Sequence, residues 1–508
     1  MKNKAELTPW YAGISRYQWL VLAVASLGWA FDVFEGQIFV TSMNEAMPEL
    51  LPPPIAALDN AARQGYLAFY NNITFASFLL GGAIGGVAFG MLSDRIGRAR
   101  TMIYTIAMYS GFTFVSALSG TWWHMAIFRF LVAVGVGGEW AVASALVAET
   151  FPKRARARSL AIFHATSVLG TLMAVAAGAF IVAERDIAES IPFLAGMGLS
   201  SWRLGFVLGA VPALLIIAVR LVLRSEPEAW QKARSQSKEG GQTSKQGEEK
   251  SKHREQQSKR GEQESRQVEP KRLGRFADLF SHELRRHTLV GVGLAAVGLA
   301  TFWGAHIYGK DVLRQAVETR YIAAGTSNLS GEANLSREAN LSREAILEEH
   351  FRDIKQWEML GMLLVTAGGG LGLLMFGPLS ERFGRRGAFL FYHLAGLVAA
   401  LVVFQTLSEV NHLLIFLPVF GFLTLGMHAG YAVYFPELFP TRLRSTGAGF
   451  CFNVGRILAA PILFLSGWMQ RDVGLSLRDS ASLLSLLFVL GAALLVFARE
   501  TKGEELPE

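Results

Sequence analysis

The stretch "GMLSDRIGRAR", residues 90–100, occurs a second time as "GPLSERFGRRG", residues 377–387, a shift of 287 positions. A second pair, "ETFPKRAR" at 149–156 and "ELFPTRLR" at 437–444, repeats at a shift of 288. Two independent matches at almost the same shift would rarely arise by chance. The chain is therefore predicted to contain two copies of one unit.

The composition and the apolar stretches place both copies in a membrane. The chain has 508 residues, of which 51% are hydrophobic and 18% charged. Its apolar stretches are each about 20 residues long, the length that crosses a hydrocarbon core of roughly 30 Å as a helix. We expect an all-α polytopic membrane protein with twelve transmembrane helices in two pseudo-symmetric six-helix bundles. The predicted spans are 17–41, 67–91, 101–119, 123–147, 157–183, 203–223, 286–308, 355–379, 386–408, 411–436, 446–469 and 480–499.

A polar linker is expected to separate the two bundles. Residues 1–225 hold the first six spans and residues 284–508 the last six. The linker, 226–283, is rich in both charge signs at about 234–272, where it cannot bury a core and is expected to be disordered. Its basic residues could instead bind anionic lipid. An extended extracytoplasmic loop is expected at about 309–354, where a six-residue unit resembling "NLSREA" occurs three times.

Clusters of arginine and lysine set the expected orientation. They follow spans 2, 4, 8 and 10, which end on one side of the membrane if the spans alternate. Because basic residues concentrate in cytoplasmic loops, we expect both termini on the cytoplasmic side of a cell inner membrane. The net charge of +7 then reflects topology rather than a nucleic-acid partner. The single cysteine, Cys451, lies within a span and excludes an internal disulfide.

Span 4 and the repeated loop motif resemble a known family. Residues 129–156 read "RFLVAVGVGGEWAVASALVAETFPKRAR". Together with the Gly-x-Leu-Ser-Asp-Arg-x-Gly-Arg signature at 90–98, this pattern resembles the major facilitator superfamily, in particular its sugar-porter-like proton symporters for niacin and aromatic acids, sialic acid and organic acids. The resemblance implies a secondary transporter that works by alternating access. "FDVFE" at 31–35 departs from the Phe-Asp-x-x-Asp of the niacin group by ending in Glu.

Two carboxylates in span 1 are the first candidate site. Asp32 and Glu35 are three residues apart and share one helical face. An acid at mid-span costs roughly 2.5–3.5 kcal/mol on insertion scales, so this face should line a central cavity. Arg129 of span 4 falls in the same layer, and the resemblance implies that it pairs with Asp32. Conformations that vary this separation would bind and release a proton. Glu139, deeper in span 4, would be a second stop for the proton; a static buried salt bridge is the alternative.

Other polar residues within the spans are candidates for binding the substrate. Arg456, near the middle of span 11, could clamp a carboxylate with its planar fork, or fix span 11 against a cytoplasmic acid. Each lone histidine could contact a substrate or form a hydrogen bond between helices. The expected substrate-binding residues are Asn71, Asn72, His164, Trp303, His306, His428, Tyr431, Asn453 and Arg456.

The repeated loop motifs are expected to gate the cytoplasmic ends of the bundles. Gly90 and Gly97 would permit a tight turn between spans 2 and 3. Asp94 could cap the next helix or pair with an arginine of span 4 or span 11. Glu149 could pair with nearby arginines, namely Arg95, Arg98 and Arg156. Topogenic charge alone would explain the arginines but not the acids repeated in both halves. The expected gating residues are Gly90, Asp94, Arg95, Gly97, Arg98, Glu149, Arg156, Gly377, Glu381, Arg382, Gly384, Arg385, Glu437 and Arg444.

These features predict a secondary active transporter that couples uptake of a small polar metabolite, foremost an organic anion such as a carboxylate, to protons. A proton antiporter exporting drugs or metabolites is the alternative in the same class. A transport-dead membrane sensor is the alternative in another. The sequence has no phosphate-binding loop, enzyme motif or metal-ligand spacing, so we expect neither ATP-driven transport nor a cofactor. The expected partners are the substrate, protons and lipid, and the protein is expected to be monomeric.

Overall fold

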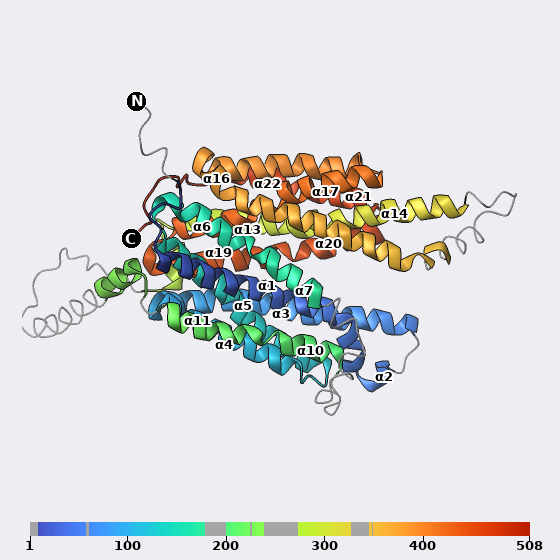
Figure 1. Ribbon diagram of the computed structural model, residues 1–508, viewed down its shortest axis with the longest axis horizontal. Helices are drawn as coiled ribbons and strands as arrows, with labels where there is room; N and C mark the ends of the chain where they lie inside the picture. Colours follow the sequence, from blue (N-terminus) through green and yellow to red (C-terminus); the bar gives the residue numbers. More distant parts are fainter. Residues whose placement is uncertain are drawn as a thin grey trace, which may run out of the picture.

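Long, nearly parallel helices make up the described part of the protein (Figure 1). The computed structural model describes residues 9–56, 60–177, 200–223, 226–237, 273–326, 345–347 and 349–508. Within these ranges the chain forms helices and their connections, and no strand. The prediction of an all-α polytopic fold is confirmed.

The helices of the first half begin and end where local sequence signals require. Ser15 and Gln18 form a capping box at the start of the first helix, and Thr121 caps the fifth through the backbone N–H of His124. Gly97, with φ of 113°, separates the third and fourth helices, because side chains other than hydrogen are strained there. The elements are α1 (Arg16–Leu50), α2 (Pro53–Ala56), α3 (Asn60–Ile96), α4 (Arg98–Ser116), α5 (Trp122–Thr150), α6 (Lys153–Ala165), α7 (Ser167–Ala177), α10 (Ser201–Leu208), η3 (Val211–Leu214) and α11 (Leu215–Val222).

The second half repeats this arrangement. Gly384, the counterpart of Gly97, has φ of 83° and interrupts the 55-residue element α16, which therefore contains two spans. The elements are η4 (Phe276–Phe280), α13 (Arg285–Gly304), η5 (His306–Tyr308), α14 (Gly309–Thr326), α16 (Phe351–Gln405), α17 (Val410–Leu425), α18 (His428–Leu438), η6 (Thr441–Leu443), α19 (Arg444–Ala459), α20 (Pro461–Arg471), α21 (Leu477–Ser485) and α22 (Leu487–Leu494).

In the described ranges, every expected span lies largely within helix. There, nine segments are long and apolar enough to cross a membrane. The segment Gln356–Gln405 holds two of the expected spans, on either side of Gly384. The remaining two expected spans correspond to α4 and to α19 with α20. The twelve-helix prediction is therefore confirmed, while the end of the expected fifth span, 178–183, lies outside the described residues.

The two expected polar segments differ from expectation where they can be compared. Residues 309–326, expected to begin a loop, form α14, and the apolar segment Arg285–Ala324 runs through both α13 and α14. Residues 234–237, expected to be disordered, continue a helix that starts at residue 228. This helix is attached to α3, because the Trp230 indole donates a 2.8 Å hydrogen bond to the Asp94 carbonyl. The rest of the linker, 238–272, and the six-residue repeats up to 344 lie outside the described residues.

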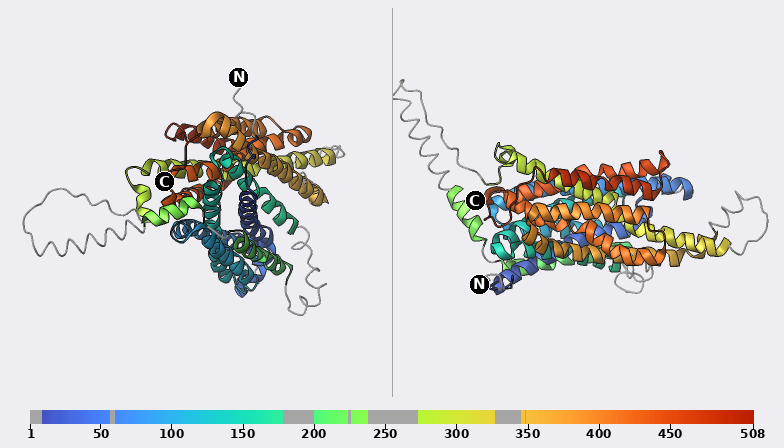
Figure 2. Two further views of the ribbon diagram at one scale, coloured as in Figure 1. Left: turned by 60° about the vertical axis from the view of Figure 1, so that its left-hand side comes forward. Right: turned by 90° about the horizontal axis from the view of Figure 1, so that it is seen from above.

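The two halves pack side by side, with α19 against α3 and α5, and α16 against α6. Figures 1 and 2 show them as a blue-to-green and a yellow-to-red group of helices. Within the first half, α3 and α5 approach so closely that a Cβ on Gly137 would lie 2.0 Å from the Gly82 carbonyl oxygen. Small residues of this kind allow membrane helices to pack backbone to backbone.

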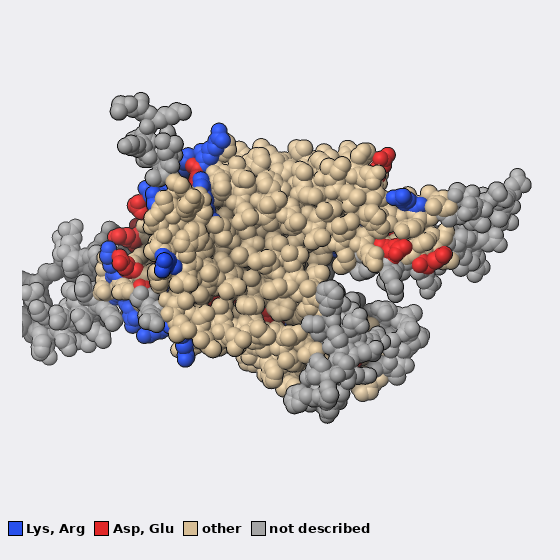
Figure 3. All heavy atoms as spheres, in the orientation of Figure 1, with Lys and Arg blue, Asp and Glu red and all other residues tan. Residues whose placement is uncertain are grey.

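Basic side chains gather at one end of the molecule. In Figure 3 most of the visible lysines and arginines cover the end where both described termini lie. The C-terminal segment crosses this end, because the Pro507 carbonyl accepts hydrogen bonds from Arg444 Nη2 at 2.7 Å and from the Thr441 N–H at 3.1 Å. We call it the terminal end of the bundle. The Asp94 and Glu149 motifs lie here as well.

Candidate functional site

A buried ion pair joins α1 to α5 through Glu35 and Arg129. Both side chains are fully buried. Glu35 also accepts a 2.7 Å hydrogen bond from Thr113 of α4. The rings of Phe39 and Phe78 each lie 4.8 Å from the guanidinium carbon, so the cation is enclosed by aromatic faces as well as paired.

The expected pairing of Asp32 with Arg129 is wrong in this structure. Arg129 donates to Glu35 instead, through Nη1 and, at 3.3 Å, through Nη2. At about 1.5 Å of rise per residue, Asp32 lies about 4.5 Å deeper along α1 than Glu35, which shares the level of Arg129. Glu35 also has one more methylene with which to reach the guanidinium.

Asp32 is therefore a buried carboxyl group that Arg129 does not pair with. It is 1% exposed, and neither oxygen has a hydrogen-bond partner among the described residues. The charges that act on it are those of Glu139, Glu35 and Arg456. Burying an ionised carboxylate without a partner costs far more free energy than burying the neutral acid. This site is thus suited to gaining and losing a proton.

Glu139 is the third acid of this region. Its Oε2 accepts a hydrogen bond from Thr105 of α4, and its Oε1 has no partner within the described part of the chain. A Cβ on Gly28 would lie 2.7 Å from Oε1, so α1 makes room for this carboxylate only because residue 28 is glycine. Asp32 follows Gly28 by one helical turn.

Arg456 reaches from the second half toward the first. Its Nη1 lies 3.2 Å from the position of a Cβ on Gly82 in α3, and its guanidinium carbon lies 5.2 Å from the Phe452 ring centroid. Among the residues that the structure covers, no hydrogen bond or ion pair of this guanidinium is recorded. The Asp32 carboxyl is the acid whose charge acts on it. The alternative, in which Arg456 is tied to a cytoplasmic acid, is not what the structure has.

Asn453 and Trp140 extend the surroundings of Arg456. The Asn453 amide donates to the carbonyls of Gly137 at 3.3 Å and Gly449 at 3.0 Å, while its Oδ1 is buried without a partner among the described atoms. The ring of Trp140 stacks on Phe452 with centroids 4.2 Å apart. Aromatic faces, an amide oxygen and a guanidinium thus meet where α19 contacts α3 and α5.

The other expected substrate-binding residues divide into two groups. Three have protein partners that join helices: His164 accepts from Trp140 at 3.2 Å, His306 bonds Thr424 at 2.7 Å, and Tyr431 donates to the Leu294 carbonyl at 3.1 Å. For the two histidines, these contacts match the alternative in which a lone histidine forms a hydrogen bond between helices. In the second group, His428 and Asn71 each have one buried atom that lacks a partner in the described ranges. The Trp303 ring lies edge-on to Phe75 of the other half. The side chain of Asn72 lies outside the described residues.

A dense polar network joins the two halves at the terminal end. Asp94 accepts from Arg98 at 2.7 Å and caps α19 through the N–H and hydroxyl of Thr446, at 2.9 and 2.6 Å. Glu149 accepts from Arg98 at 2.8 Å and from Arg444 at 2.6 Å. All of these charged groups are fully buried. The network therefore holds α3, α4 and α5 against α19.

The second copy of the motif forms a related but smaller network. Arg385 donates to Glu437 at 2.7 Å, and Glu381 accepts from Arg158 of the other half at 2.6 Å. The latter pair is partly exposed. Arg382 lies over the Phe383 ring at 5.3 Å, and no ion pair is recorded for it in the described ranges. The halves are thus joined asymmetrically, more strongly through Asp94 than through Glu381.

Two expected pairings with Glu149 are wrong. Arg95 lies on the exposed side of α3 and donates to the carbonyls of Leu273 and Gly274, both at 3.4 Å. Arg156 turns back to the Ala148 carbonyl at 3.0 Å, near the end of α5. Arg98 and Arg444 take the places at Glu149 instead.

The motif glycines have two separate roles. Gly97 has positive φ and forms the expected turn, and its counterpart Gly384 does the same in the second half. Gly90 does not form a turn; it lies within α3, where a Cβ would be 2.7 Å from the Ser445 carbonyl oxygen. Gly377 likewise lets α16 approach Arg158 of α6, since a Cβ would be 2.8 Å from its Cα. One glycine of each copy thus permits contact between the halves.

Sequence reasoning missed two acids that complete these networks. Glu226, after α11, accepts the backbone N–H of Arg98 at 2.6 Å. Glu500, after α22, accepts the N–H of Arg385 at 2.8 Å. Each acid caps the helix that follows a positive-φ glycine, where a carboxylate is favoured by the helix dipole. The available signal was an acid shortly after the last span of each half.

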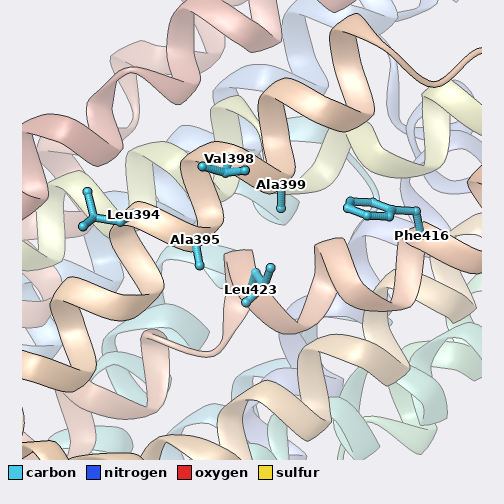
Figure 4. A pocket seen from close by; sticks show the side chains of 6 residues that line it. All are labelled: Leu394, Ala395, Val398, Ala399, Phe416 and Leu423. Atoms are coloured by element: carbon cyan, nitrogen blue, oxygen red, sulfur yellow. The ribbon is translucent and has the colours of Figure 1, made fainter.

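An apolar pocket on α16 and α17 is separate from these groups. It is lined by Leu394, Ala395, Val398, Ala399, Phe416 and Leu423 (Figure 4). None of these side chains carries a hydrogen-bonding group. A polar metabolite would therefore find its partners around Asp32 and Arg456 rather than here.

Comparisons with known proteins agree with this arrangement of helices. The family model described as Major Facilitator Superfamily matches residues 37–462. A niacin transporter of Acinetobacter baylyi is 23% identical over 97% of this chain and 96% of its own length. A sialic acid transporter of Escherichia coli is 24% identical over 95% and 96%. Among solved structures, the proton:xylose symporter XylE bound to 6-bromo-6-deoxy-D-glucose has a TM-score of 0.64, with 17% identity and coverage of 96% and 98%.

Proposed function

Because the chain belongs to the Major Facilitator Superfamily and is a multi-pass membrane transporter of metabolites, we propose that it is a proton-coupled symporter for a small organic anion. It would work as a monomer in the inner membrane, with the terminal end facing the cytoplasm. The basic side chains at that end support this orientation, since such residues are retained on the cytoplasmic side.

The observation that carries the proposal is the buried Asp32 carboxyl without a hydrogen-bond partner among the described residues. Arg129, the cation expected to pair with it, is engaged by Glu35. Asp32 can therefore change its protonation state without first breaking an ion pair. It would be the site at which the transported proton is held.

Arg456 supplies the corresponding site for an anion. A guanidinium can hold a carboxylate through two parallel hydrogen bonds, and no ion pair between Arg456 and a protein carboxylate is recorded in the described structure. The Phe452 and Trp140 rings beside it would contact the apolar part of the substrate. Niacin and sialic acid, which the names of two relatives contain, are both carboxylic acids.

Charge couples the two sites. With Asp32 ionised, its negative charge compensates Arg456 and opposes the arrival of a second anion. Protonation of Asp32 removes this opposition, so proton and anion would bind together. Linkage is reciprocal, and the bound anion would favour the proton by the same factor.

Alternating access would use the polar network at the terminal end. In the structure this end is closed, because Asp94 and Glu149 hold the first half to Thr446 and Arg444 of the second. Opening toward the cytoplasm would require these contacts to separate while the opposite end closes. Asp94 and Glu381 would thus act as gates.

Purified protein in liposomes with an alkaline interior tests the proposal. We expect uphill accumulation of at least one of niacin, sialic acid and cis,cis-muconate, together with acidification of the interior. Asp32→Asn should abolish accumulation but keep exchange of internal for external substrate, which needs no deprotonation. Proton efflux coupled to substrate entry would indicate an antiporter. Undiminished accumulation by the variant would contradict the assignment of Asp32.

A further inference from the structure

We propose that Tyr109 of α4 relays the transported proton between Asp32 and Glu139. The proposal rests on the proposed proton coupling and extends it to a residue that touches no part of the substrate site described above. Its basis is that α4 and α1 carry corresponding groups in the same order along their lengths.

One face of α4 carries Thr105, Tyr109 and Thr113, spaced by four residues. Thr105 donates to Glu139 Oε2, and Thr113 donates to Glu35 Oε1 at 2.7 Å. The Tyr109 ring therefore lies between two hydroxyls that each hold a buried acid. Its own hydroxyl is fully buried and has no partner among the described residues.

The facing side of α1 has the same order. Gly28 adjoins Glu139 Oε1, and Glu35 adjoins Thr113, so these two contacts mark the ends of the shared stretch. The stretch is about 10 Å long on α1 and about 12 Å on α4, at 1.5 Å of rise per residue. Asp32 lies between the marks on α1, as Tyr109 does on α4. The two residues therefore lie at one level.

The charged groups around Tyr109 come from α1, α5 and α19. The carboxyls whose charges act on its hydroxyl are Asp32, Glu139 and Glu35. Arg129 is held by Glu35, and Arg456 acts on Asp32. Four buried oxygens of Asp32, Glu139 and Tyr109 have no described partner: both of Asp32, Oε1 of Glu139 and the Tyr109 hydroxyl. Each such group costs about 1–3 kcal/mol, so four in one place call for a functional reason.

A neutral phenol can transfer a proton between two acids without changing its own charge. Once hydrogen bonds, direct or through one water, join the three groups, Asp32 would give its carboxyl proton to the Tyr109 oxygen as the original phenol proton passes to the Glu139 carboxylate. The O–H bond of Asp32 breaks and that of Glu139 forms, while the phenol oxygen gains one proton and loses another, so the tyrosine finishes neutral. Glu139 lies ten residues from Glu149 along α5, so the proton moves toward the terminal end.

Tyr109→Phe tests the relay, because it removes only the hydroxyl. We expect the initial rate of proton-coupled niacin, sialic acid or muconate uptake to fall by about tenfold or more, as for loss of a positioned proton-transfer group. Substrate exchange without a pH gradient should be unchanged. Ser110→Ala is the matched control: it removes a neighbouring hydroxyl that is also buried and without a described partner.

The outcomes separate the relay from proton coupling itself. A wild-type protein that moves substrate without proton flux would contradict the proposed function. Normal proton flux in both wild type and Tyr109→Phe would overturn the relay alone. An equal loss in Tyr109→Phe and Ser110→Ala would assign the hydroxyl to packing and would also overturn it.

Discussion

Glu35 and Arg129 form a fully buried ion pair between α1 and α5, three residues along α1 from Asp32, which has no hydrogen-bond partner among the described residues. The two acids of one helical face therefore have different tasks. Glu35 neutralises a cation that would otherwise be buried alone, while Asp32 is available for a proton. We therefore expect the amide substitutions Glu35→Gln and Asp32→Asn to change the stability of the protein in different ways.

Glu35→Gln should destabilise the protein by about 3–5 kcal/mol, because it leaves Arg129 buried without a counter-charge. Asp32→Asn should be neutral or stabilising, since it removes a buried group that has no partner in the described structure. Thermal unfolding in detergent at fixed pH compares the two variants. Equal losses of stability would show that Asp32 also contributes to holding the helices.

Gly28→Ala should disturb coupling more than folding. The new Cβ would lie 2.7 Å from Glu139 Oε1, so the carboxylate must move from its place beside Thr105. The gain in helix propensity, about 1 kcal/mol, offsets part of the strain. We expect a severalfold slower proton-coupled uptake at nearly unchanged melting temperature. Gly111→Ala, where a Cβ meets nothing within 4 Å, is the control and should transport normally.

Asp94→Asn should open the terminal end more than Glu381→Gln. Asp94 is buried and bonds both Arg98 and the start of α19, whereas Glu381 makes one partly exposed ion pair. A cysteine at Ala141, which faces Gly449 across the halves, reports access when Cys451 is replaced by Ala. We expect labelling to rise about fivefold or more for Asp94→Asn, a shift of roughly 1 kcal/mol. A larger rise for Glu381→Gln would reverse the asymmetry.

Arg456→Gln should weaken carboxylate binding by roughly ten- to a hundredfold, which corresponds to a charge-assisted hydrogen bond of about 1.5–3 kcal/mol. Arg456→Lys should fall between this variant and wild type, because a point charge cannot reproduce the planar fork. Affinity for niacin, sialic acid and muconate can be measured by calorimetry. Arg314→Lys, a surface pair at the opposite end, is the control. Unchanged affinity in Arg456→Gln would remove this residue from the site.

The repeated motifs made the fold predictable. The twofold occurrence of the loop sequence identifies two units, and apolar length identifies their spans. The glycines at 97 and 384 mark the breaks that the backbone has at both places. These features depend on local sequence, which is why they could be inferred without knowing how the helices pack.

The partners within the site were less predictable. The layer of Asp32, Glu35 and Arg129 followed from helical rise, but the choice between two acids depends on how far α1 is rotated and shifted against α5. Tyr109 was missed because one tyrosine in an apolar helix looks like core. Glu226 and Glu500 were missed because they lie at a shift of 274, outside the repeats found at 287 and 288.

The Glu226 and Glu500 caps also bear on how the chain is made. Each joins the end of one half to a helix of that same half, Glu226 to α4 and Glu500 to the part of α16 that follows Gly384. As the ribosome extends the chain, the Glu226 cap can form once residue 226 has emerged, before any helix of the second half exists. The first half can thus be stabilised by its own cap before the second half is synthesised. If the chain is divided between residues 238 and 272 and the two halves are co-expressed, each half retains its own cap. The halves should then assemble without the covalent link.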